Sequence, residues 1–228
     1  KSLSARAGLE AAILLVGGWL YGHALVLILH GQHDARFLSE DGPIENGTAV
    51  VLVAGAVLAL ARGIRSGGRR DWRGLATGLF LAVVLVFGAG EELSWGQRML
   101  GYASPAFFQE MNSHGEVTLH NLVFGWFRLN FHVFGPPMVL ATLLWAFCAN
   151  RAVKTRPAFR RIVRSWDLPV PRLRHAWLLV LVLVAEVALG LVELADIGVT
   201  STQEHSEFAA CVIGLCVLVN RQELAPEE

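Results

Sequence analysis

Apolar residues along the chain gather into six runs, which polar or charged stretches separate. A helix that crosses the hydrocarbon core of a bilayer needs about 20 residues, within a range of roughly 17–25. Six segments reach or approach this length, and we expect each of them to form one helix. They are about residues 8–29, 44–61, 74–93, 131–150, 176–196 and 201–220. The pattern therefore predicts an all-α integral membrane bundle of about six transmembrane helices, which forms a single domain over residues 1–228.

The composition supports the same interpretation. Hydrophobic residues make up 54% of the 228 positions and charged residues 17%, and the mean hydropathy is +0.49. The hydrophobic share is higher, and the charged share lower, than in a typical soluble domain. The first apolar run is longer than the roughly 7–15 residues of a signal-peptide core, so we interpret it as a retained helix. The three cysteines all lie in apolar segments, which favours core positions over a disulfide or metal framework.

Lysine and arginine are unevenly distributed between the connecting segments. Residues 62–73 carry five arginines, and the basic loop 151–175 carries eight lysine and arginine residues. Together with Lys1, Arg6 and Arg221, these segments hold 16 of the 19 basic residues. Because cytoplasmic loops carry an excess of lysine and arginine, we expect both termini in the cytoplasm. We therefore expect a multi-pass protein of a bacterial inner membrane, with the lipid bilayer as its surroundings and no nucleic-acid partner.

This topology places most acidic residues and histidines on the opposite, periplasmic side. Seven of the eight histidines fall in that outer half, and only His175 does not. The outer segment 94–130 lies there, and we expect short interfacial helices in it, with a further one over residues 117–131. The basic loop should form a short amphipathic stretch on the cytoplasmic surface.

Several carboxylates are predicted inside the membrane or at its edge, because the segments reach about 20 residues only when these positions are included. A carboxylate in hydrocarbon costs about 2.5–3.5 kcal/mol on insertion scales, so these groups should face the bundle interior and be neutral, paired or metal-bound. Glu186 lies near mid-membrane and Glu193 follows it by two helical turns, so both are interpreted as intramembrane acids. The full set is Glu91, Glu92, Glu186, Glu193, Glu204 and Glu207.

Glu116 and His120 are the first candidates for chemistry. If residues 115–121 are helical, the two side chains lie on one face, where they can bind one divalent metal ion or form a general base. Glu204 and Glu207, three residues apart, would supply two further oxygen ligands. Ligands of this kind suit Zn²⁺, Mn²⁺, Fe²⁺ or Mg²⁺. The sequence thus predicts a recessed carboxylate and histidine site that holds a divalent ion or an activated water molecule.

The stretch after the third apolar segment supplies the other candidate groups. Glu91 or Glu92 would act as a general acid or base. Three further residues would bind substrate, with the arginine opposite an anionic headgroup: Arg98, Ser94 and Asn121. Ser94 is interpreted as a hydrogen-bonding hydroxyl, because its surroundings lack the GxSxG motif of a nucleophilic serine.

A purely structural interpretation of the same groups stays open, in which they cap helices and pair with Arg98 and Arg128. Trp95 and Trp126 are interpreted as aromatic residues of the membrane interface.

Four short strings resemble the motif blocks of a family of bacterial multi-pass membrane proteins whose function is uncharacterised. The strings are EDGPIE at 40–45, GEELSWGQRMLG at 90–101, HGEVTLHN at 114–121 and EHSE at 204–207. The similarity covers most of the chain from about residue 35 to 210. The resemblance implies that the strings belong together in one fold, and it implies no particular reaction.

Two functions of different classes follow from these observations. The first is a membrane-embedded enzyme, metal-dependent if the predicted ligands converge, that acts on an amphiphilic or lipid-linked substrate. The second is a non-catalytic subunit of a membrane complex, or a small proton or solute transport module, whose polar outer belt fixes helix packing.

Overall fold

Helices account for most of the described chain. The computed structural model describes residues 3–30, 32, 37, 42–68, 70–129, 132–133, 136–195 and 202–221. Its long helices are α1 (Leu3–Leu29), α2 (Pro43–Gly68), α3 (Trp72–Glu92), α9 (Leu173–Ala195) and α10 (Thr202–Val219). A further helical run consists of α6 (Pro136–Leu144), the π-helical segment η3 (Trp145–Ala149) and α7 (Asn150–Thr155).

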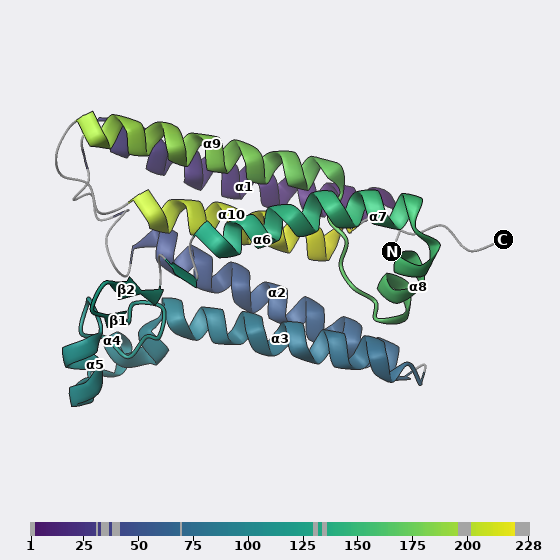
Figure 1. The fold of residues 1–228 in the computed structure, drawn as a ribbon, viewed down its shortest axis with the longest axis horizontal. Coiled ribbons are helices and arrows are strands. Elements are labelled where there is room, and N and C mark those ends of the chain that lie inside the picture. The colour runs from purple at the N-terminus through teal and green to yellow at the C-terminus, as the bar shows by residue number, and fades with distance from the viewer. Residues whose placement is uncertain are drawn as a thin grey trace.

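The long helices run side by side along one axis (Figure 1), and α10 lies at their centre, where it packs against α1, α2 and α9. One end of the bundle carries small elements, and the opposite end carries α8 (Pro157–Ser165) and the beginning of α1. The small elements are α4 (Gln97–Leu100), α5 (Ala106–Met111) and the antiparallel strands β1 (Val123–Phe124) and β2 (Phe127–Arg128). Polar groups are thus collected at two distant ends of an apolar bundle.

Three helices in the described part of the chain are long and apolar enough to cross a membrane. They are Ser4–Leu29, Pro43–Gly68 and Trp72–Glu92, with 26, 26 and 21 residues. Large apolar side chains point outward from them, including Leu15, Val50 and Phe80, which are 75%, 68% and 67% exposed. Such surfaces suit lipid rather than water. The apolar part of α10, by contrast, is largely buried among its neighbours.

A tight glycine contact joins α2 to α3. A Cβ atom added at Gly78 would lie 2.5 Å from the Cα of Gly63 and 2.7 Å from the carbonyl oxygen of Ala59. In membranes, small residues four apart let helix backbones approach closely and so give packing contacts that larger residues prevent. Gly74 and Gly78 on α3 and Ala59 and Gly63 on α2 follow this spacing.

Gly78→Leu is expected to destabilise the folded protein by about 1–3 kcal/mol or more, because the added side chain meets backbone atoms that cannot rotate away. Thermal unfolding of the purified protein in detergent measures this effect. Gly18→Leu is the matched control, since an added Cβ at that position of α1 meets nothing within 4 Å. Equal unfolding temperatures for the two variants would contradict the close packing of α2 on α3.

The predicted helix 44–61 is too short. α2 continues to Gly68, so that Arg62 and Arg65 lie on its last turns. Arginine is a good helix former, and its long side chain can reach the water while its backbone stays helical. The chain then turns, and Asp71 caps α3 by accepting a hydrogen bond from the Gly74 backbone N–H at 3.2 Å. The amphipathic stretch expected in the basic loop is present as α8, with Val163 buried.

The interfacial helix expected over residues 117–131 is wrong in its described part. The chain there forms β1 and β2, which pair Val123 with Arg128 and Phe124 with Phe127. Gly125, with a φ of 63°, lies in the turn between them, a left-handed conformation that glycine adopts without strain.

Candidate functional site

The candidate site begins where α3 ends, in a turn with an uncommon backbone conformation. Ser94, Trp95 and Gly96 have φ angles of 45°, 53° and 79°, all in the left-handed region. Non-glycine residues rarely adopt this conformation, and a bulky one keeps it only where surrounding contacts hold it. The turn separates α3 from α4 and so sets the direction of the segment that carries Arg98.

The indole of Trp95 holds this turn against the last part of α3. Its Nε1–H donates to Glu91 Oε1 at 2.7 Å, and its ring lies edge-on to Phe87 with the centroids 5.5 Å apart. Gly90 leaves room for the ring, because a Cβ there would lie 2.9 Å from two indole atoms. Trp95 therefore has a structural role beyond the interfacial one that the sequence predicts.

Glu91 is the centre of the site, and its residue is only 5% exposed. Besides the Trp95 indole, it accepts hydrogen bonds from the backbone N–H groups of Leu119 at 2.6 Å and His120 at 2.9 Å. Its Oε2 also lies 3.2 Å from His120 Nδ1. A carboxylate surrounded by donors in this way is an ionised acceptor, which fastens the loop before β1 to the end of α3.

The contact with Glu91 fixes both the orientation and the tautomer of His120. Because the carboxylate can only accept, Nδ1 of the imidazole carries the proton. The side chain is 25% exposed, and no hydrogen-bond partner for Nε2 is present in the described part of the chain. Nε2 is therefore the ring nitrogen that external molecules can reach, and in the neutral imidazole it is an acceptor.

A second ionic group lies beside this pair and contains Arg98. Its guanidinium donates to Glu45 at 2.5 Å, to Glu116 at 3.2 Å and to the carbonyl oxygen of Glu92 at 3.0 Å. The other carboxylate oxygen of Glu116 accepts a 2.5 Å hydrogen bond from the Ser94 hydroxyl. Ser94 thus forms a hydroxyl hydrogen bond, as its sequence context indicates, while its role in binding substrate stays a prediction. Arg98 is occupied by carboxylates of this chain, so its contact with an anionic headgroup stays a prediction.

Neutral side chains complete the frame of the loop. Asn112 donates to the backbone and hydroxyl oxygens of Thr118, both at 2.8 Å, and its own Oδ1 accepts from the His114 backbone N–H at 2.8 Å. Gln97 binds the Ser104 hydroxyl at 2.6 Å and the Val117 backbone N–H at 2.8 Å. These bonds hold the segment in a fixed position over the end of α3.

The helix expected over residues 115–121 is wrong, and with it the shared face of Glu116 and His120. Gly115 has a φ of 69°, and the segment consists of turns and bends. Two of its backbone N–H groups, those of Glu116 and His120, bond to the side chains of Asn112 and Glu91 instead of forming helical hydrogen bonds. Glu116 consequently contacts Arg98, while His120 contacts Glu91.

Only part of the predicted metal set lies within the described residues, because the Glu204 side chain lies outside them. The described residues contain no group of three or more His, Cys, Asp or Glu side chains that could hold one metal ion. Glu92 lies at the end of α3, and Glu207 lies on α10. The backbone carbonyl of Asn121 accepts from the Ser113 backbone N–H at 3.0 Å. Three predicted site residues have side chains outside the described part: Glu186, Glu193 and Glu204.

A second buried ionic cluster, centred on Glu10 of α1, was missed at the sequence level. Glu10 accepts from Arg174 Nε at 2.8 Å, from His175 Nε2 at 2.8 Å and from Asn220 Nδ2 at 2.5 Å. The residue is 3% exposed, and the cluster joins α1 to α9 and to the residue after α10. The available signal was a lone carboxylate in a 27-residue apolar helix.

The fold and its lipid-facing surface define the chain as a helical membrane protein. A scan against protein-family models and searches of curated proteins and solved structures found no match. The site must therefore be interpreted from its own geometry.

Proposed function

We propose that the chain is a multi-pass enzyme of a bacterial inner membrane, in which His120, oriented by Glu91, acts as a general base toward an amphiphilic substrate. The observation that carries this proposal is the contact of His120 Nδ1 with the buried carboxylate of Glu91 at 3.2 Å. A carboxylate that holds an imidazole in one tautomer, with the other nitrogen accessible, is the arrangement of a positioned base.

The proposed chemistry is proton abstraction from water or from a substrate hydroxyl. His120 Nε2 accepts that proton, and the negative charge of Glu91 stabilises the imidazolium that forms. Glu91 does not touch the reacting atoms, so it is a positioning residue. The contacts of Glu91 with two backbone N–H groups and with Trp95 keep the carboxylate in place while the imidazole changes charge.

The proposed topology has six spans with both termini in the cytoplasm and the site facing the periplasm. It is supported by the opposite placement of the two polar ends, because α8 and the beginning of α1 lie at one end and α4 and α5 at the other. Basic residues mark the cytoplasmic side of a membrane protein.

The proposed family relationship also has support from the contacts. Three of the four motif strings meet at the site: Glu45 of the first bonds to Arg98 of the second, and Glu116 of the third bonds to both Arg98 and Ser94. Strings that are far apart in sequence thus serve one local structure.

A non-catalytic role is the second candidate, and one observation favours it. Both oxygens of Glu91 and both oxygens of Glu116 accept hydrogen bonds from donors of this chain. A network in which every carboxylate oxygen is bonded is sufficient to hold the loop over the bundle without any catalytic role. Such a role fits a subunit of a membrane complex or a small proton or solute transport module.

Hydrolysis of two chromogenic esters by detergent-purified protein distinguishes the two roles: p-nitrophenyl decanoate, which has an apolar chain, and p-nitrophenylphosphorylcholine, which carries a lipid headgroup. A general base contributes about 100-fold or more, so His120→Ala should lower turnover by that factor, while Glu91→Gln should give a smaller loss. His114→Ala, which removes an exposed imidazole from the same loop, is the matched control and should retain activity. Equal rates in the His120 and His114 variants would contradict the enzyme proposal and favour the packing role.

A metal ion is not required by this proposal. His120 Nε2 could serve as one ligand, with Glu91 in the position of the carboxylate that orients a metal-binding imidazole. The other predicted ligands include Glu204, whose side chain lies outside the described part of the chain. Metal binding by this set therefore stays a prediction, and the proposed proton transfer does not depend on it.

A further inference from the structure

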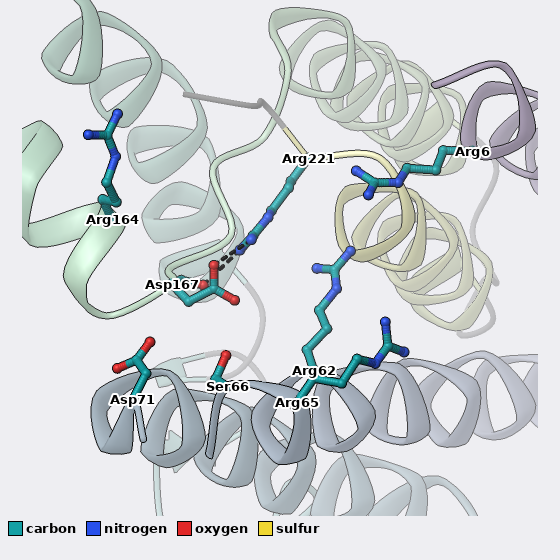
Figure 2. Close-up of a pocket in the computed structure, with 8 residues that line it drawn as sticks. All are labelled: Arg6, Arg62, Arg65, Ser66, Asp71, Arg164, Asp167 and Arg221. Atoms are coloured by element: carbon teal, nitrogen blue, oxygen red, sulfur yellow. Dashed lines mark hydrogen bonds and ion pairs between the residues drawn. The ribbon is translucent and has the colours of Figure 1, made fainter. Parts of the chain in front are cut away.

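A polar cavity of about 330 Å³ (Figure 2) lies at the α8 end of the bundle, and α4 and the Glu91 site lie at the other end (Figure 1). It is formed by residues from α1, α2, α8, the turn before α3 and the segments after α8 and α10. The lining residues are Arg6, Arg62, Arg65, Ser66, Asp71, Arg164, Asp167 and Arg221. Five arginines and two aspartates leave the cavity with a net charge of +3 when all are ionised.

The two carboxylates in the cavity already have partners within the fold. Arg221 donates to Asp167 through both a carboxylate oxygen and, at 2.9 Å, the backbone carbonyl. Asp71 caps α3 through the Gly74 N–H at 3.2 Å. Figure 2 shows Arg6, Arg62 and Arg65 together on one side of the cavity, with Asp71 and Asp167 across from them. Positive charge therefore dominates one wall.

Arg62, on the last turns of α2, is half-buried in this cavity beside three other arginines. The charges of Arg221, Arg6 and Arg65 all repel it, and Asp167 attracts it. Like charges held together in a cavity raise the free energy of the protein when no anion is bound. An anion in the cavity would remove that repulsion.

The aromatic residues beside the cavity locate it at the membrane surface. Trp72 follows Asp71 in the chain and Trp166 precedes Asp167, and the two indole rings meet edge-on with centroids 5.5 Å apart. Both rings are partly exposed, and Arg73 lies over the Trp72 ring at 5.5 Å. Tryptophan is enriched at the level of lipid headgroups, so the cavity opens where headgroup and water meet.

We propose that this cavity binds a phosphate-bearing anion, held by the guanidinium groups of Arg62 and Arg65 with Arg6 closing the same wall. Planar guanidinium groups bind phosphate oxygens through paired hydrogen bonds, and basic pockets between membrane helices are suited to phospholipid headgroups. The same chemistry fits a headgroup from the bilayer or a phosphate compound from the aqueous phase. The site is separate from the Glu91 site and independent of the proposed reaction.

Native mass spectrometry and thermal unfolding of the detergent-purified full chain test the proposal with two probes: dioctanoyl phosphatidic acid and inorganic pyrophosphate. Binding to the double variant Arg62→Gln/Arg65→Gln should weaken about tenfold or more, because charge-assisted hydrogen bonds are lost. Arg151→Gln/Arg156→Gln removes the same charge from exposed positions outside the cavity and should change binding less than about twofold.

The two probes identify the source of the anion. Binding of phosphatidic acid alone, weakened only in the cavity variant, assigns the site to a lipid headgroup. Binding of pyrophosphate with the same sensitivity assigns it to a soluble phosphate compound. If the double variant does not fold, the single variant Arg65→Gln, at an exposed position, replaces it in the same binding measurement. Equal weakening in the cavity and control variants, or no binding of either probe, would overturn the proposal.

Discussion

Glu10→Ala is expected to destabilise the protein by about 2–6 kcal/mol, because two buried donors lose their acceptor and each such loss costs about 1–3 kcal/mol. The change leaves His175, which is fully buried, and Asn220, which is 3% exposed, without their acceptor. The Arg174 side chain is 48% exposed and can turn toward water, so its loss adds little. Thermal or denaturant unfolding of the purified protein measures the effect.

Two comparisons isolate the cause of this destabilisation. Glu110→Ala removes an exposed carboxylate from α5 and should leave the unfolding temperature nearly unchanged. Glu10→Gln keeps an acceptor for His175 and so should lie between Glu10→Ala and the unmodified chain. An unfolding temperature for Glu10→Ala that matches the Glu110 control would show that the cluster does not join α1, α9 and α10.

Glu91→Ala is expected to release the loop over the end of α3 and to lower stability by on the order of 3 kcal/mol. The backbone N–H groups of Leu119 and His120 and the indole of Trp95 all lose their acceptor. Each buried donor left without a partner costs about 1–3 kcal/mol, and the loop can relax part of this loss. Hydrogen exchange measured by mass spectrometry should show faster exchange over residues 112–122.

The effect of Glu91→Ala should be local, unlike that of Glu10→Ala. Exchange within α1 and α10 should stay slow, because these helices pack against each other and α10 also packs against α2 and α9. Unchanged exchange over residues 112–122 would show that the carboxylate does not hold the loop.

The long helices were predictable from sequence because their apolar runs have membrane length. The errors in the predicted helices lie where local backbone preferences determine the structure. Arg62 and Arg65 mark a charged boundary in the sequence, but arginine continues a helix readily and α2 extends past both. Residues 117–131 are as apolar as an interfacial helix would be, yet Gly125 allows a turn between β1 and β2.

The sequence predicted which residues form the site, but it did not predict which of them contact one another. The sequence indicated that Glu91, Ser94, Arg98, Glu116 and His120 gather at one end of the bundle. It paired Glu116 with His120 through an assumed helix, whereas the structure pairs His120 with Glu91, 29 residues away. Trp95, which also bonds to Glu91, has a left-handed backbone that its residue type disfavours and that tertiary contacts stabilise.

The tautomer of His120 tests the central claim most directly. Protein labelled with ¹⁵N-histidine and placed in lipid nanodiscs would be studied by NMR, with His120→Ala used to assign the signals. We expect a proton on Nδ1 and, in the neutral imidazole, none on Nε2, because Glu91 accepts from Nδ1. A neutral imidazole with its proton on Nε2 would contradict the proposed general base.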